Sequence, residues 1–390
     1  MKRKISNALL LAFCLSLFPA SAFYSFSVAD AQTSTRPRQT ASPTTKPTAS
    51  PITRTTATPT ISSPLPAAKT SPTATPTPDI DDPNEVIKIE TEEVNLNVRV
   101  VDRNNRPVNN LQKDEFKVYE NNVLQPITAF SKAEVPTNYS LVIDNSGSLR
   151  QQLDKVIEAG KILVAANRPD DETSVIRFVS SEKVEILQDF TNSKNDLNEA
   201  LENLFIEGGK TAIIDAVYLA AERTDSYEKS RNPNDKKRRA LILVSDGEDR
   251  DSFYKEQQLY ELLRESDVQI YVIGFVGDLE KEGGFISKSP QGKAKAFLER
   301  LSTETGGKVY FPNSVNELPD IARDISNELR TQYLVSYSPT DKVQDNSYRN
   351  IKVAVADSPK KEKRIAITRS GITRSGENGA KPSLQNRIKN

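Results

Sequence analysis

The feature that most constrains the fold of this chain is an alternation of apolar runs and amphipathic segments between residues 137 and 330. The apolar runs include YSLVID (139–144), ALILVSD (240–246) and VQIYVIGFV (268–276), and the segments between them place apolar residues at helical spacing. Strands that are apolar along their whole length are buried on both faces, so helices must cover both sides of their sheet. The pattern predicts an α/β domain with a parallel sheet and right-handed crossover connections.

The segments on either side of this region read as β-structure. Residues 94–102 alternate polar and apolar side chains, and residues 116–130 predict a hairpin that turns at Asn121 and Asn122. Three further strands are expected after residue 331, and we predict that they pair with the first flank to form one small β module. The predicted boundaries are 86–133 and 332–368 for the two parts of the β module, 134–331 for the α/β domain, and 369–390 for a disordered tail.

The N-terminal residues have the pattern of an export signal. Basic residues at positions 2–4 precede the apolar run 8–18, and small-residue patterns end at Ala22 and Ala31. We expect residues 1–31 to be a signal peptide cleaved after one of these two alanines, with a buried N-terminal helix as the alternative. The apolar run is well short of the roughly 20 residues that a membrane-spanning helix needs. The mature protein is therefore expected in the periplasm, at the cell surface or secreted, with no transmembrane span.

Residues 32–85 are dominated by Thr, Ser, Ala and Pro. Such a segment has too little apolar surface to offset the entropy lost on ordering, and its prolines favour extended geometry. We expect a disordered spacer between the signal peptide and the folded part.

The composition excludes several classes of site. The chain has 53 basic and 53 acidic residues, no His and one Cys. The balanced charge gives no field that would attract nucleic acid. Imidazole catalysis, a Cys–His nucleophile pair and the usual zinc sites are excluded. A metal site must use oxygen ligands, which suit Mg²⁺, with Mn²⁺ or Ca²⁺ as alternatives.

Three separate stretches carry such oxygen ligands where the predicted strands end or a helix begins. Asp144, Ser146 and Ser148 follow the first strand of the α/β domain, Thr211 lies in a Gly-rich stretch before a helix, and Asp246 ends another strand. Ligands in open α/β sheets bind beyond the carboxyl ends of the strands, so these five side chains are expected to converge on one hard cation. Taken singly, each has a simpler interpretation: a turn for the two serines, and a helix N-cap for Thr211.

The order Asp144-Asn145-Ser146-Gly147-Ser148, then Thr211, then Asp246 resembles the metal-ion-dependent adhesion site (MIDAS) of von Willebrand factor type A domains. The flanking segments further resemble an exported bacterial group called VWFA-related. The resemblance implies a doubly wound, Rossmann-like, mostly parallel sheet with one antiparallel edge strand. It also implies hydroxyl ligation by Ser146, Ser148 and Thr211, with Asp144 and Asp246 acting directly or through water.

The function expected from these residues is binding, not catalysis. Hydroxyl ligands leave Mg²⁺ incompletely neutralised, so an Asp or Glu carboxylate of a protein partner can complete its coordination. One alternative is a scaffold with a purely structural metal, and another is a metal-dependent phosphohydrolase. Phosphohydrolases with an aspartyl nucleophile resemble DxDx[TV], in which Ser146 would replace the second acid. We interpret Glu248, Asp249 and Asp251 as solvated charges, and expect loop 277–292 to influence partner choice.

Overall fold

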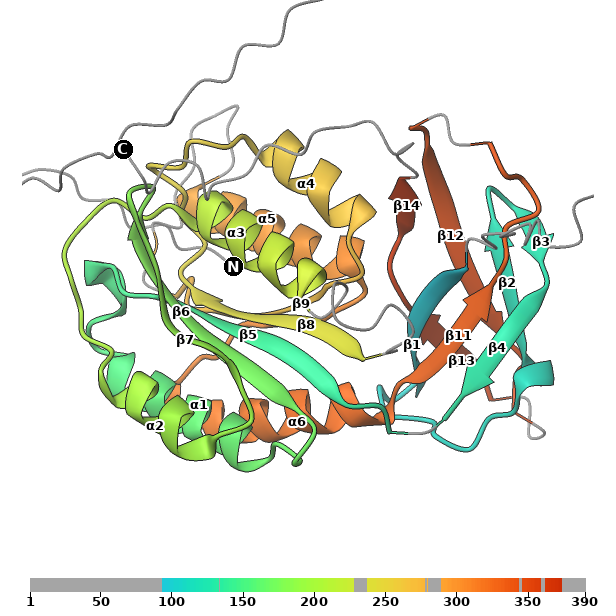
Figure 1. The fold of residues 1–390 in the computed structure, drawn as a ribbon, viewed down its shortest axis with the longest axis horizontal. Coiled ribbons are helices and arrows are strands. Elements are labelled where there is room, and N and C mark those ends of the chain that lie inside the picture. The colour runs from blue at the N-terminus through green and yellow to red at the C-terminus, as the bar shows by residue number, and fades with distance from the viewer. Residues whose placement is uncertain are drawn as a thin grey trace, which may run out of the picture. The chain divides into compact units, whose positions relative to one another are not determined.

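The computed structural model describes residues 93–132, 134–227, 237–277, 279, 289–343, 346–358 and 362–373 (Figure 1). The predicted signal peptide and spacer lie outside these residues, as do most of loop 277–292 and residues 374–390 of the predicted tail.

A six-stranded sheet forms the centre of the α/β region, in the order β10-β9-β8-β5-β6-β7. Its strands are β5 (Thr137–Asp144), β6 (Glu172–Ser180), β7 (Lys183–Thr191), β8 (Arg238–Ser245), β9 (Gln269–Gly274) and β10 (Val309–Tyr310). All neighbouring strands are parallel except β7, which pairs with β6 in the antiparallel direction at one edge. The sheet is therefore mostly parallel with one antiparallel edge strand, as predicted.

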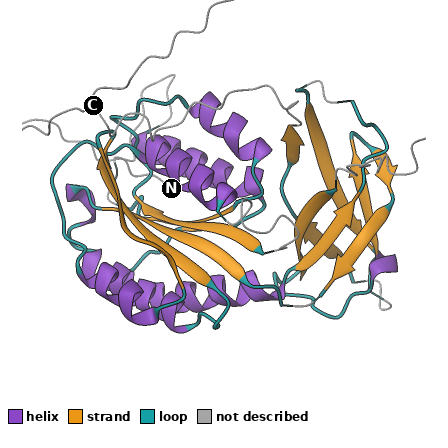
Figure 2. Ribbon diagram, viewed as in Figure 1, coloured by secondary structure: helices purple, strands orange, loops and turns teal. Residues whose placement is uncertain are grey.

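Helices cover both faces of this sheet (Figures 1 and 2). One layer consists of α1 (Leu153–Ala165), α2 (Lys194–Glu202) and α6 (Leu318–Thr331), and the other of α3 (Ile213–Ser226), α4 (Glu256–Glu265) and α5 (Pro290–Thr305). Short 3-10 turns lie at Lys113–Glu115, Gly147–Leu149 and Val315–Glu317. The two helical layers make the domain doubly wound.

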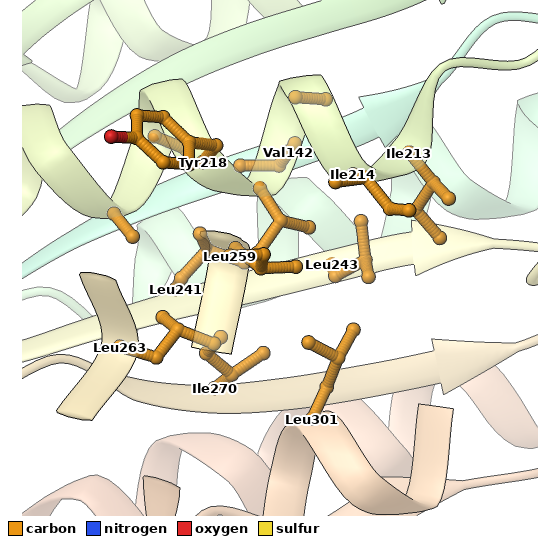
Figure 3. Packing of buried hydrophobic residues seen from close by; sticks show 14 of the residues in the cluster. Val142, Ile213, Ile214, Tyr218, Leu241, Leu243, Leu259, Leu263, Ile270 and Leu301 are labelled. Atoms are coloured by element: carbon orange, nitrogen blue, oxygen red, sulfur yellow. The ribbon is translucent and has the colours of Figure 1, made fainter. Parts of the chain in front are cut away.

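Alternate side chains of each central strand enter the two cores. Leu241 and Leu243 of β8 pack beneath α3, α4 and α5, whereas Ile242 of the same strand packs beneath α1 and α6. Figure 3 shows the first of these cores, with side chains from β5, β8 and β9 facing those of α3 and α4. Since both faces are buried, the strands must be apolar along their length, which explains the runs seen in the sequence.

The two flanks of the chain form a second, antiparallel unit of two four-stranded sheets with a shared core. The sheet orders are β13-β1-β11-β4 and β14-β12-β2-β3. The strands are β1 (Val94–Asp102), β2 (Phe116–Glu120), β3 (Val123–Gln125), β4 (Ile127–Ser131), β11 (Tyr333–Tyr337), β12 (Tyr348–Val355), β13 (Arg364–Ile367) and β14 (Gly371–Thr373). The pairing of β1 with β11 and of β2 with β12 confirms that strands before and after the α/β region pair with each other.

The C-terminal boundary of this β module differs from the expected one. Strand β14 pairs with β12 and contains the buried Ile372, although residues 369–390 were expected to be a disordered tail. This strand lies within the polar repeat ITRSGITRSG and has only three residues. Three residues are too few to show the alternation of polar and apolar side chains that indicates a strand.

The β module joins the α/β region through buried arginines. Arg238 at the start of β8 donates to the backbone oxygens of Leu329 and Gln332 at the end of α6, and its Nε donates to Asn97 Oδ1 of β1. Arg99 of β1 forms a 2.6 Å ion pair with Glu328 of α6. Arginine contacts therefore tie the last helix of the α/β region to the β module.

Candidate metal centre

The edge of the central sheet where β5 and β8 end brings two of the predicted sequence stretches together. These strands are direct parallel neighbours, with Ile143 opposite Val244, so their carboxyl ends lie side by side. Asp144 is the last residue of β5, and Asp246 follows the last residue of β8. Both side chains are buried. The strand register thus places both predicted carboxylate ligands at one edge.

The turn after β5 orients Asp144 and the two serines. The Asp144 Oδ1 accepts a 2.9 Å hydrogen bond from the Ser146 backbone N–H, and its Oδ2 accepts a 2.8 Å bond from the Ser245 hydroxyl. The hydroxyl oxygens of Ser146 and Ser148 are 2.9 Å apart. The structure therefore brings Asp144, Ser146 and Ser148 into one hydrogen-bonded group.

Thr211 is attached to the loop that follows Asp246. Its backbone oxygen accepts hydrogen bonds from the N–H groups of Arg250 (2.8 Å) and Asp251 (3.1 Å), and its side chain is buried. The helix N-cap interpretation of Thr211 is wrong, since the N-cap residue of α3 is Ala212, whose side chain cannot accept a hydrogen bond. The Thr211 hydroxyl is thus not used to begin the helix.

The electrostatics of the two carboxylates favour a bound cation. Burial raises the pKa of Asp144 to about 6, and the negative charge of Asp246 acts in the same direction, against hydrogen bonds from Ser146 and Ser245. Among the described residues, neither carboxylate forms an ion pair with a basic side chain. A divalent cation would supply the missing positive charge, so the residues present fit a metal ion.

Hydroxyls are an essential part of this ligand set. Within the described part of the chain, no three acidic or Cys side chains gather as a metal cluster of their own. A site at this edge therefore depends on neutral hydroxyls beside two carboxylates, which is a hard oxygen environment of low total charge.

Ser245 and Asn145, two neighbours of the predicted ligands, position the site. Ser245 holds Asp144, as described above, and its position just before Asp246 is the signal that could have revealed it. Asn145 is fully buried, and its Nδ2 donates a 2.7 Å hydrogen bond to the backbone oxygen of Phe205. The Asn145 backbone oxygen also accepts from the N–H of Glu207, so this residue ties the serine turn to the stretch leading to Thr211.

The acidic residues after Asp246 are not simple solvated charges. Asp249 Oδ1 accepts hydrogen bonds from the N–H of Ile214 (3.2 Å) and the Ser252 hydroxyl (2.5 Å), so it caps the start of α3. Burial raises its pKa, with the charge of Asp215 contributing. Glu248 pairs with Arg250, and Asp251 Oδ2 accepts from the Ser181 N–H at 3.4 Å. Asp249 is exposed to solvent, as predicted, and Glu248 and Asp251 are partly exposed, but all three acids also fix the loop and the helix around the site.

The family model of the von Willebrand factor type A domain matches residues 140–324. Residues 140–324 form a von Willebrand factor type A (VWA) domain. The matched range begins in β5, just before Asp144, and ends within α6, so all five predicted ligands of the VWA domain lie inside it. Among curated proteins, none matches the chain in sequence.

Several solved structures are similar to this chain. BatB of Bacteroides thetaiotaomicron, a conserved hypothetical protein, is 20% identical, with 49% of this chain and 98% of that chain covered and a TM-score of 0.36. A von Willebrand factor type A protein from Catenulispora acidiphila is 12% identical, with 74% of each chain covered and a TM-score of 0.41. Proximal thread matrix protein 1 from the mussel byssus, with a zinc-occupied MIDAS motif, is 20% identical, with 50% of this chain and 48% of that chain covered and a TM-score of 0.39.

None of the helices in the described residues is both long enough and apolar enough to cross a bilayer.

Proposed function

We propose that the VWA domain is a divalent-cation-dependent protein-binding module, in which an Asp or Glu carboxylate of a protein partner completes the coordination of the metal. One observation carries this proposal. Two buried carboxylates, Asp144 and Asp246, lie at the sheet edge beside hydroxyl groups, and no basic side chain of the described residues pairs with them. An uncompensated buried pair of this kind is costly unless a cation neutralises it.

The roles of the individual ligands follow from their chemistry. The ion would be held by the hydroxyls of Ser146, Ser148 and Thr211, and by Asp144 and Asp246 directly or through water. Mg²⁺ is the proposed ion, with Mn²⁺ or Ca²⁺ as alternatives. When bound, the ion supplies an electrophilic position for an external carboxylate. Asn145 and Ser245 hold the ligands in place, which limits the reorganisation needed for binding.

The contacts of Glu248 and Asp249 argue against the alternative of a purely structural metal. That alternative requires a carboxylate of this chain to fill the open position. Glu248 is paired with Arg250, and Asp249 caps α3, so both acids nearest to Asp246 in sequence are engaged elsewhere. These contacts support a site that remains open to a partner.

We also propose that the domain is not an enzyme and that the protein is exported. The chain has no His, and position 146, where an aspartyl phosphohydrolase would carry its second acid, is a serine. Turnover of generic phosphate esters by the purified protein would contradict the first proposal. The signal-like residues 1–31 support the second, and a protein that stays in the cytoplasmic fraction with residues 1–31 uncleaved would contradict it.

Metal titration and partner capture test the main proposal together. Isothermal titration with Mg²⁺ is expected to show binding to the wild type and to Asp170→Ala, an exposed acid remote in sequence from the site, but not to Asp144→Ala or Ser146→Ala. Proteins captured from an envelope extract in Mg²⁺ should be released by chelator. Capture that persists in chelator, or equal metal affinity in all four proteins, would show that the metal is not the contact.

A further inference from the structure

A groove of about 610 Å³ lies beside the metal edge of the VWA domain. One wall is the loop that directly follows Asp246, beginning with Gly247 and Glu248, and the opposite wall is α5, with Ala296 and Phe297 among its lining residues. The groove therefore begins one residue from a proposed metal ligand. Its volume lies within the range of pockets that bind ligands in proteins.

The walls combine an apolar floor with a charged rim. Ile214 at the start of α3 and Ala294 of α5 are buried beneath the groove, and Phe297 is half-buried beside them. These side chains belong to the core between α3, α4 and α5, so the floor of the groove is the side of that core that faces the loop after Asp246. A large apolar side chain placed there would remove its surface from water.

The charged side chains on the rim of the groove differ in whether they have an oppositely charged partner. Arg300 pairs with Glu256 at 2.9 Å, and Arg250 pairs with Glu248. The remaining acid, Asp249, accepts the two hydrogen bonds described above. Lys293 is exposed, and no acidic side chain in the described part of the chain forms an ion pair with it. The groove thus offers one available positive charge.

We propose that this groove receives the segment of the protein partner next to its metal-binding acid, through a large apolar side chain followed by a second acid that faces Lys293. The inference rests on the proposed function, because the metal contact fixes where the partner segment begins. The apolar floor selects the first side chain, and the charge of Lys293 selects the second. The partner class is therefore an acidic segment with an aromatic or leucine anchor, not any accessible carboxylate.

Labelled model peptides test this selection on the full chain. Each peptide carries one Asp followed, after one to four Gly residues, by Phe, and matched peptides carry Ala in place of Phe. Fluorescence polarisation in Mg²⁺ is expected to show at least about tenfold tighter binding of a Phe peptide than of its Ala match. Adding Glu after Phe should strengthen binding severalfold in the wild type and weaken it in Lys293→Glu.

Two variants of α5 separate the groove from the metal. Ala296→Trp fills the groove and should abolish the preference for Phe, while the Mg²⁺ affinity and the weaker binding of the Ala peptide are retained. Glu299→Trp, an exposed position on the same helix that does not line the groove, should behave as the wild type.

The outcomes distinguish the two proposals. Equal Mg²⁺-dependent binding of Phe and Ala peptides would overturn the groove assignment and leave the proposed function intact. Absence of Mg²⁺-dependent binding by every peptide would overturn both. If Ala296→Trp destabilises the chain without any peptide and the wild type shows no preference for Phe, the groove is not open to a partner, which overturns the assignment.

Discussion

Replacing Arg238 by Met is expected to destabilise the protein by about 4 kcal/mol. The guanidinium donates to Leu329 O, to Gln332 O at 3.1 Å and to Asn97 Oδ1 at 3.2 Å, and hydrogen bonds from a charged donor contribute about 1.5–3 kcal/mol each. Burial lowers the pKa of Arg238 to about 10, so the group stays charged at pH 7. At about 1.4 kcal/mol per pKa unit, this desolvation costs roughly 3 kcal/mol, which the Met variant recovers.

Urea unfolding of the full chain at pH 7 measures this effect. The chain has no Trp, so circular dichroism and tyrosine fluorescence are suitable signals. Arg239→Met is the matched control, because Arg239 is the next residue of β8, is only partly buried, and its Nε has no hydrogen-bond partner. A difference below about 1 kcal/mol between the two variants would refute the argument that Arg238 secures the end of α6.

Three further variants test the site and the junction. Asp144→Asn should abolish Mg²⁺ binding. It should also raise the free energy of unfolding of the metal-free protein at pH 7 by about 1–3 kcal/mol, because it removes a buried charge near Asp246. A lower free energy of unfolding in urea with chelator present would contradict this. Gly306→Ala should lower the melting temperature more than Gly277→Ala. Gly306 has φ +78°, and a Cβ there would lie 2.5 Å from a backbone nitrogen, whereas a Cβ at Gly277 would meet open space. Equal melting temperatures of the two variants would contradict this prediction. Glu328→Gln should cost about 3 kcal/mol in urea unfolding, because it leaves the buried Arg99 without its carboxylate and Lys308 with Asp324 alone. An unchanged midpoint would show that the pairs contribute nothing.

Much of the α/β architecture is predictable from the sequence, because burial on both faces leaves a plain signal. The runs 139–144, 240–246 and 268–276 each overlap a central strand, and the ends of run and strand differ by no more than two residues. The three-residue strand β14 gives no such signal, because its pairing depends on β12, which is more than 15 residues earlier in the chain. Short strands whose formation depends on distant partners are set by tertiary contacts, not by local pattern.

The residues of the candidate site are likewise only partly predictable from the sequence. Asp144, Ser146 and Asp246 are recognisable because they follow apolar strands, and the parallel register then brings these strand ends together. The roles of Asn145 and Asp249 are not recognisable, since each acts through a backbone group of a segment more than 30 residues away. The sequence thus reveals groups by their chemistry, whereas the groups that position them emerge only from the fold.

The two ends of the central sheet have opposite chemistry, and this opposition supports the proposal that a partner binds at the end where Asp144 and Asp246 lie. In a doubly wound domain the helices end at the edge away from the strand carboxyl ends, so their partially negative C-termini gather there. Guanidinium groups occupy these positions: Arg238 at the end of α6, Arg330 at Ala166 after α1, and Arg369 at the last carbonyls of α4. Arg369 belongs to the β module and Arg238 contacts its first strand, so the β module packs against the edge that carries the helix C-termini. The carboxylates and hydroxyls therefore lie at the opposite edge, where none of the described strands of the module takes the position proposed for a partner acid.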